Sequence, residues 1–159
     1  MRSSARRWGI ITCMSTRKLI SLFVLLAVVA LPLLAERKAV HPKEFPTGRP
    51  FSPGVWAGKT FYVAGQTGQD LKTGKSPQEF EAEVKETFAH IDLILKGAGL
   101  SFDDVVAVNV YLTDMTLFPR LNQVYNTFFK EPRPVRTTVG VAKLVGDARI
   151  EITVVAYKQ

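Results

Sequence analysis

Cysteine is almost missing from this sequence, which holds a single one, Cys13, among 159 residues. Cys13 lies ahead of an apolar run that we expect to be removed, so the mature chain would contain no thiol. That excludes disulfide bonds, thiolate metal sites and a cysteine nucleophile. The two histidines, His41 and His90, lie far apart in the sequence and predict neither a metal site nor a catalytic dyad. We therefore expect no metal and no cofactor.

Long apolar runs are also scarce, and the main one extends from Leu19 to Leu34. Two basic residues precede it, while small Ala35 and three charged residues follow, which is the layout of a secretory signal peptide. Its 16 residues fall short of the roughly 20 that a membrane-spanning helix needs, and an uncleaved anchor is the alternative. We predict a cleaved signal peptide at residues 1–35, export to the periplasm or the exterior, and no stable membrane association afterwards.

Clustered positive charge is missing from the rest of the chain. The formal net charge is +7, but five of the 21 basic residues lie before Glu36, whereas all 14 acidic residues lie from Glu36 onward. The chain from Glu36 therefore carries 16 basic and 14 acidic residues, a net charge of +2. A nucleic-acid-binding face needs clustered basic residues with interleaved aromatic side chains, so we predict no nucleic-acid partner.

One compact domain is expected over residues 50–159. Residues 36–49 are polar, contain proline and show no periodicity, which predicts a flexible lead-in to that domain. Two short apolar runs flank Gly58, which is typical of a β-hairpin. The second strand of this hairpin is expected over about residues 60–64, ending at Gly65.

The clearest helix is predicted over residues 76–99. Ser76 is a suitable N-cap, Pro77 suits the first helical position, Glu79 completes a capping box, and Gly97 and Gly99 supply the stop. Apolar side chains recur at spacings of three and four, which predicts one buried face: Phe80, Val84, Phe88, Ile91 and Leu95. Three glutamates are expected to face elsewhere: Glu79, Glu83 and Glu86.

The second half of the chain alternates between strand and helix patterns. Residues 103–113 predict a strand that is apolar on both sides and is therefore central or covered by another subunit. A shorter helix follows, with the stripe Phe118, Leu121, Val124 or Tyr125, and Phe128. In the segment PVRTTVGVAKLVGDARIEI, residues 134–152, two strand-like runs face each other across a Gly-Asp turn. Arg136 opens the first run and Glu151 lies in the second, so each otherwise apolar run carries a charge.

The predicted order is strand, strand, helix, strand, helix, strand, strand. This order predicts an α+β fold, a two-layer sandwich in which two helices cover one face of a mixed sheet. The other face is too apolar to lie in water, because five side chains of the last two strands cannot all point toward helices: Val139, Val141, Ile150, Ile152 and Val154. We therefore expect an oligomer that buries sheet against sheet.

Three segments resemble the successive signature blocks of the Rid/YjgF family, the reactive-intermediate (enamine/imine) deaminases. They are PFSPGVWAGKTFYVAGQTGQDLKTGK, VNVYLTDMTLFPRLNQVYNTFF and PVRTTVGVAKLVGDARIEI, and the resemblance extends from about Pro50 to Tyr157. It implies a chorismate-mutase-like fold, a homotrimer and three clefts between adjacent subunits. It also implies that Arg136 binds the carboxylate of the substrate, and that Glu151 places water or moves a proton.

Other positions match the family pattern or depart from it. Gly65 and Asn122 match positions at or near the ligand. The family often has Tyr where this chain has Phe51, Ser where it has Ala64, and Cys or another small residue where it has Thr138. Loss of the Tyr hydroxyl predicts a changed rate or substrate preference, whereas Thr138 still offers a hydroxyl. We predict substrate-binding roles for Phe51, Gly65, Asn122 and Thr138.

Some of these residues could instead have purely structural roles. Arg136 and Glu151 are alternatively a cross-strand ion pair at a subunit interface. Asn122 is alternatively an exposed polar residue of its helix, and Gly65 a turn glycine at the end of a strand.

The residue types suit imine hydrolysis. A planar guanidinium holds a carboxylate with two parallel hydrogen bonds, which orients a small 2-imino acid. Hydrolysis then needs a placed water and proton transfers to nitrogen, which a carboxylate such as Glu151 supplies. We predict a hydrolytic deaminase that converts small 2-imino acids to 2-keto acids and ammonia. The alternative is a non-enzymatic trimer that binds small carboxylates or acts as a holdase for unfolded protein.

Overall fold

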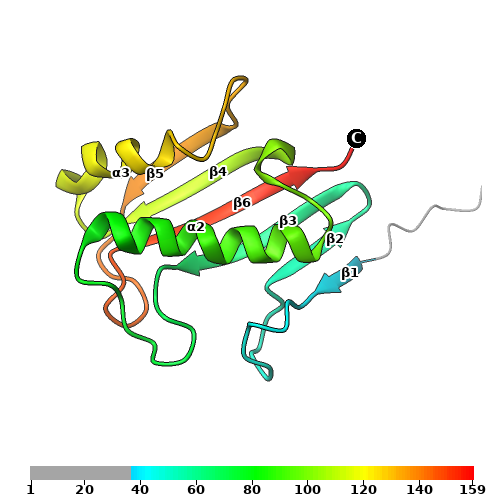
Figure 1. The fold of residues 1–159 in the computed structure, drawn as a ribbon, viewed down its shortest axis with the longest axis horizontal. Helices are drawn as coiled ribbons and strands as arrows, with labels where there is room; N and C mark the ends of the chain where they lie inside the picture. Colours follow the sequence, from blue (N-terminus) through cyan, green and yellow to red (C-terminus); the bar gives the residue numbers. More distant parts are fainter. Residues whose placement is uncertain (1–36) are drawn as a thin grey trace, which may run out of the picture. The chain divides into compact units, whose positions relative to one another are not determined.

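The computed structural model describes residues 37–159, so the predicted signal peptide lies outside the described residues. The strands are β1 (Arg37–Val40), β2 (Gly54–Ala57), β3 (Thr60–Thr67), β4 (Val105–Leu112), β5 (Val135–Gly140) and β6 (Ile150–Tyr157). The helices are α2 (Phe80–Gly97) and α3 (Phe118–Tyr125), with short 3-10 turns η1 (Phe102–Asp104) and η2 (Met115–Leu117). Both helices lie on one face of the sheet (Figure 1), which confirms the predicted two-layer α+β fold.

Strand β6 is central in the six-stranded sheet, whose order is β1-β2-β3-β6-β4-β5. It pairs antiparallel with β3 and with β4, and β4 pairs in parallel with β5, so the sheet is mixed as predicted. The expectation that the last two strands face each other is wrong, because β4 lies between them. Arg136 is consequently opposite Val108 of β4, and Glu151 is opposite Tyr111 of β4 and Thr67 of β3.

Residues 36–49 differ from the expected lead-in without regular structure. They contain β1, which pairs antiparallel with β2 at the edge of the sheet. Further along, Phe45 is 3% exposed and packs edge-on against the ring of His90 in α2, with 5.9 Å between ring centroids. Four residues are too few to show the alternation of a strand in the sequence. The strand β1 forms because it pairs with β2, which the local pattern does not indicate.

The β2–β3 hairpin forms as predicted, with Gly58 in its turn at a φ of +61°. Strand β3 is longer than expected and extends to Thr67. Its pairing with β6 shifts register between Val63 and Gln66, around Gly65. A register shift of this kind bends a strand and re-aims its side chains, and here it occurs where the candidate site begins.

Helix α2 buries the predicted apolar face, since all five predicted side chains are fully buried. Gly99, with a φ of +72°, follows the C-cap and supports the predicted stop. The start differs from the prediction, because the helix begins at Phe80 and Glu79 at its N-cap makes no side-chain cap hydrogen bond. Ser76 instead donates from Oγ to Oδ1 of Asp147 at 2.8 Å, so the predicted capping box is wrong.

Glu83 is fully buried, contrary to the expectation that it faces away from the core. Its carboxylate accepts hydrogen bonds from the backbone N–H of Arg149 at 2.7 Å and from Nε of Arg149 at 2.6 Å. The same guanidinium donates to the carbonyl oxygens of Pro77 at 2.7 Å and Gln78 at 3.0 Å. Arg149, just before β6, therefore holds the entry to α2 in place of the predicted cap.

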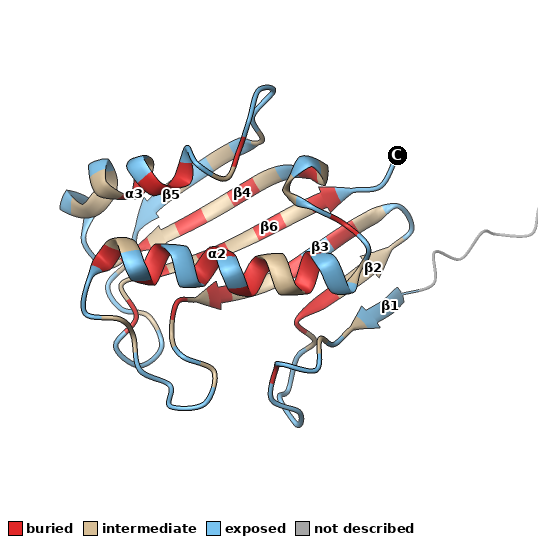
Figure 2. Cartoon of the chain, in the orientation of Figure 1, coloured by how far each residue is buried: buried red, intermediate tan, exposed pale blue. Residues whose placement is uncertain are grey.

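The core lies between the helices and the sheet, where Figure 2 shows the buried residues along the strands beneath α2. Helix α3 contributes Leu121, Val124 and Tyr125 to it. Val106 of β4 is 47% exposed, because a register shift between Val105 and Ala107 turns Val105 inward. No helix within residues 37–159 combines the length and apolarity needed to cross a membrane.

The face of the sheet opposite the helices exposes large apolar and aromatic side chains. Strand alternation places four of them there, with exposed fractions between 41% and 72%: Tyr62, Val135, Val139 and Tyr157. Of the five side chains that were not expected all to point toward helices, three are buried under the helices, Ile150, Ile152 and Val154, whereas Val139 is exposed on this face. We call the face defined by the first four residues the open sheet face, and its burial by another subunit stays a prediction.

The buried contact between Glu83 and Arg149 predicts a large effect on stability. We expect Glu83→Ala to lower the free energy of unfolding by about 3 kcal/mol, because Arg149 loses its buried acceptor. Urea unfolding monitored by circular dichroism measures the change. The matched control is Glu81→Ala on the same helix, which removes a partly exposed ion pair with Arg120 and should change the stability far less. Equal losses in the two variants would contradict the assignment.

Candidate functional site

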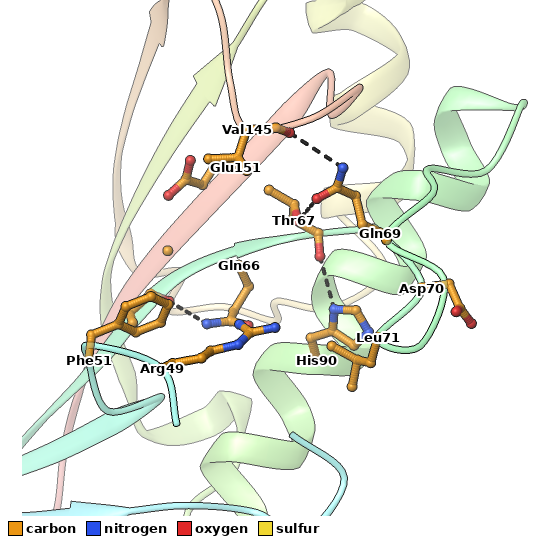
Figure 3. A pocket seen from close by; sticks show the side chains of 13 residues that line it. Arg49, Phe51, Gln66, Thr67, Gln69, Asp70, Leu71, His90, Val145 and Glu151 are labelled. Carbon is orange, nitrogen blue, oxygen red and sulfur yellow. Dashed lines mark hydrogen bonds between the residues drawn. The ribbon is translucent and has the colours of Figure 1, made fainter. Parts of the chain in front are cut away.

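A pocket of about 520 Å³ opens beside the ends of β3 and β6 (Figure 3). Its walls come from the segment before β2, the end of β3 with the loop that follows, one turn of α2, and the loop that enters β6. Three of the predicted site residues line it: Phe51, Gly65 and Glu151. The pairing of β3 with β6 brings the last two together, since Thr67 lies opposite Glu151.

Gly65 is explained by the close approach of Glu151. A Cβ atom at position 65 would collide with Oε1 of Glu151 and lie 2.8 Å from its Cδ. The interpretation of Gly65 as a strand-end turn glycine is wrong, because this residue lies inside β3 and has no positive φ. Glycine therefore lets the carboxylate lie directly against the backbone of β3, at the wall of the pocket.

Two buried polar side chains that were not predicted to line a site form part of the pocket wall. Gln66 is 4% exposed and donates from Nε2 to the carbonyl oxygen of Ala64 at 2.9 Å. His90 is 3% exposed, with Nδ1 2.9 Å from the carbonyl oxygen of Thr67. Because a carbonyl oxygen only accepts, Nδ1 carries the hydrogen, and Nε2 lies 3.3 Å from Oε1 of Glu86. These bonds hold both side chains in fixed orientations.

Contacts between the loop that follows β3 and the loop that precedes β6 hold the rim of the pocket. Asp147 accepts hydrogen bonds from Nε2 of Gln69 at 2.9 Å and from Oγ of Ser76 at 2.8 Å. These bonds, the one from Gln69 first, lower the pKa of the Asp147 carboxyl because they stabilise its charged form. Gly146 has a φ of +63°, and a Cβ there would collide with the Gln69 amide. The two loops therefore fit closely where they meet.

Arg136 does not line this pocket. It lies on the edge strand β5, opposite Val108, on the helix side of the sheet. Its guanidinium carbon is 4.5 Å from the ring centroid of Tyr125 and 5.3 Å from that of Phe118 in α3. Within residues 37–159, neither Arg136 nor Glu151 takes part in a salt bridge. The two predicted catalytic residues are therefore apart and unpaired in one chain.

Unpartnered hydroxyl groups lie near Arg136. The hydroxyl of Tyr125 and Oγ1 of Thr138 are both buried without a hydrogen-bond partner among the described residues. Burial raises the pKa of Tyr125, an effect that the positive charge of Arg136 partly offsets. Thr138 follows Arg136 by two residues on β5, so both point to the same side of the sheet. Buried hydroxyls normally have partners, so this cluster is incomplete in an isolated chain.

Asn122 belongs with this second group. It lies four residues after Phe118 and three before Tyr125 on α3, so it shares a helix face with the two rings that contact Arg136. The predicted site residues thus form two clusters in one chain. The pocket cluster holds Phe51, Gly65 and Glu151, and the β5–α3 cluster holds Asn122, Arg136 and Thr138. Among residues 37–159, no group of three His, Cys, Asp or Glu residues is placed to hold a metal ion.

Comparison with known proteins finds relatives that match about two thirds of this chain and most of their own length. The family model described as endoribonuclease L-PSP matches residues 42–158. A RutC family protein of Aquifex aeolicus is 38% identical over 111 residues, which cover 69% of this chain and 89% of the relative. A protein of Dermatophagoides farinae named 2-iminobutanoate/2-iminopropanoate deaminase is 36% identical over 104 residues, covering 65% and 81%.

A solved structure agrees with this assignment. RidA from an Antarctic Psychrobacter bacterium is 34% identical, with a TM-score of 0.71, over 76% of this chain and 99% of that one. The matched region contains both clusters of predicted site residues and nearly all the described elements. The chain therefore belongs to the endoribonuclease L-PSP family, the family of the Rid/YjgF proteins.

Proposed function

We propose that this protein is a hydrolytic deaminase of small 2-imino acids, acting as a homotrimer with its sites between subunits. The observation that carries the proposal is the separation of Glu151 from Arg136. Each is a charged residue without a salt-bridge partner within residues 37–159, and the cluster around Arg136 holds two buried hydroxyls that have no hydrogen-bond partner among the described residues. A second copy of the chain would bring the β5–α3 cluster of one subunit against the pocket of its neighbour.

The open sheet face supports such an assembly. Tyr62, Val135, Val139 and Tyr157 are all large and exposed in one chain. Large apolar side chains exposed on one face of a sheet often mark an interface between proteins. Val135 and Val139 also lie on β5, the strand that carries Arg136. An interface over this face would therefore bring Arg136 close to the neighbouring subunit.

The proposed reaction is the addition of water to the C=N bond of a 2-imino acid. Arg136 holds the carboxylate of the substrate through two parallel hydrogen bonds, and the rings of Phe118 and Tyr125 support its guanidinium. Glu151 accepts a proton from the attacking water and passes it to nitrogen, which gives a carbinolamine. The hydroxyl proton of this intermediate then moves to the amino group through the same carboxylate, so that the C–N bond breaks, ammonia leaves and the C=O bond of a 2-keto acid forms. The name of the Dermatophagoides farinae relative supports this substrate class. Phe51 brings a ring but no hydroxyl to the pocket.

Substitutions of the two charged residues should fail in different ways. Arg136→Lys keeps the charge but loses the planar fork, so we expect a higher KM and a lower kcat/KM. Glu151→Gln keeps the size but not the base, so we expect kcat to fall by about 10²- to 10⁴-fold while carboxylates still bind. The assay measures ammonia released from freshly generated 2-iminopropanoate.

The alternatives give other results in the same assay. If the two residues form only an interface ion pair, both variants hydrolyse imines normally and their melting temperatures fall together. A binding protein without catalysis binds carboxylates but releases no ammonia even as the wild type. A holdase suppresses aggregation with little dependence on Arg136.

The proposed trimer predicts a distinct sedimentation result. We expect a chain that begins at residue 36 to sediment at three times its monomer mass at micromolar concentration. Val139→Glu should raise the dissociation concentration by tenfold or more, roughly the effect of an unpaired charge in an apolar interface. The matched control is Ala82→Glu, at an exposed alanine of α2 on the other side of the sheet, which should leave the mass unchanged. A stable monomer of the wild type would contradict the assembly.

We also propose that residues 1–35 direct export and are removed, because an apolar run follows basic residues and precedes Ala35. The imine would then arise outside the cytoplasm, for example from an amino-acid oxidase. Fractionation of the native host should find a shortened chain outside the cytoplasm that begins near Glu36. A full-length cytoplasmic product would contradict export, and a full-length membrane-bound product would indicate an uncleaved anchor.

A further inference from the structure

Arg49 places an unassigned positive charge in the wall of the pocket. It lines the same pocket as Phe51 and Glu151, and its guanidinium carbon is 5.8 Å from the ring centroid of Phe51. Within residues 37–159 it takes part in no salt bridge, although Arg120, Arg133 and Arg149 each have a carboxylate partner. Arg49 is exposed in one chain, so its donors are available to a molecule in the pocket.

The acidic residues of the pocket do not neutralise Arg49. The carboxylate of Asp70 accepts hydrogen bonds from the backbone N–H groups of Lys72 at 3.0 Å and Thr73 at 2.7 Å, which engages it in its own turn. In Figure 3 the Asp70 side chain points away from the pocket, and Glu151 lies on the side away from Arg49. A negative charge at one end of the pocket is therefore separated from a positive charge at the other.

The pocket is larger than the volume that a three-carbon substrate would fill. At about 520 Å³ it falls in the range of sites that hold larger ligands, roughly 300 to 1,000 Å³. A three-carbon imino acid leaves much of this space to water. The guanidinium of Arg49 points toward Gln66 and His90 in this remaining space, as Figure 3 shows.

We propose that Arg49 determines specificity by binding a second carboxylate, so that the preferred substrates are dicarboxylic 2-imino acids. The inference rests on the proposed deaminase function, in which Arg136 of a neighbouring subunit holds the first carboxylate. Arg49 presents the planar fork that matches a carboxylate with two hydrogen bonds. Gln66 uses one of its two amide hydrogens for Ala64, and the other is available to the same carboxylate.

Glu151 adds to the selectivity by repulsion. Its carboxylate disfavours a second negative charge nearby, so the far end of a dicarboxylic substrate is directed toward Arg49. A substrate with an apolar side chain leaves the Arg49 donors to water and gains nothing from them. Attraction at one end and repulsion at the other therefore favour the same orientation.

The test compares kcat/KM for dicarboxylic and monocarboxylic imines. The imines 2-iminosuccinate, 2-iminoglutarate and 2-iminobutanoate are generated in the assay by amino-acid oxidases, and ammonia release is followed. We expect the wild type to prefer the better dicarboxylic imine to 2-iminobutanoate by about tenfold or more, and Arg49→Gln to reduce this ratio by about tenfold. The matched control is Arg37→Gln on β1, an exposed arginine outside the pocket, which should leave the ratio unchanged. A wild-type preference for 2-iminobutanoate, or an unchanged ratio in Arg49→Gln, would overturn the proposal.

A binding measurement separates this proposal from the proposed reaction. If the wild type hydrolyses none of the imines, the deaminase function fails, but calorimetry with 2-oxoglutarate and 2-oxobutanoate still decides the role of Arg49. A loss of about tenfold in affinity for 2-oxoglutarate alone, in Arg49→Gln, supports the second carboxylate site. Equal losses for both ligands, or none, would overturn it. Melting temperatures of the variants show that each is folded.

Discussion

Strand β6 pairs along its length with two neighbours, β3 on one side and β4 on the other. Ile150, Ile152, Val154 and Ala156 point from it into the core under the helices. Just before it, Arg149 binds the buried carboxylate of Glu83 and two carbonyl groups at the entry to α2. The position of the main helix over the sheet thus depends on how this one strand begins.

The same strand order governs the candidate site. Because β4 lies between β5 and β6, Arg136 belongs to the sheet edge, whereas Glu151 lies in the centre against Gly65. Strand alternation also places the two charges on opposite faces, since the neighbours of Glu151 on β6 point into the core. A carboxylate substrate that needs both residues therefore needs two copies of the chain. The exposed valines of β5 offer the surface through which a copy would approach.

Local sequence patterns were sufficient to predict the features that depend on residues close together in the chain. The apolar stripe of α2, the β2–β3 turn at Gly58 and the α+β class all follow from periodicity and turn chemistry. Strand order was not predictable in this way, because it depends on contacts between distant segments. The burial of Glu83 requires Arg149, which lies 66 residues later, and no helical period signals such a partner.

The candidate site was likewise predictable only in part. Arg136, Glu151 and Gly65 were found through the family resemblance, which also explains why their roles stay predictions for this chain. Arg49, Gln66 and His90 were not predicted to line a site, since only the folded chain brings their segments to one pocket. The need for glycine at position 65 was also not predictable from neighbouring residues, because it arises from the contact with Glu151 on another strand.

Mixing two inactive variants tests the shared site most directly. Subunits with Arg136→Ala and subunits with Glu151→Gln would be produced together so that they form mixed trimers. If each site takes Arg136 from one subunit and Glu151 from the next, a random equal mixture regains about a quarter of the wild-type activity, because that fraction of interfaces carries both native residues. If each site lies within one chain, the mixture stays as inactive as its two parents.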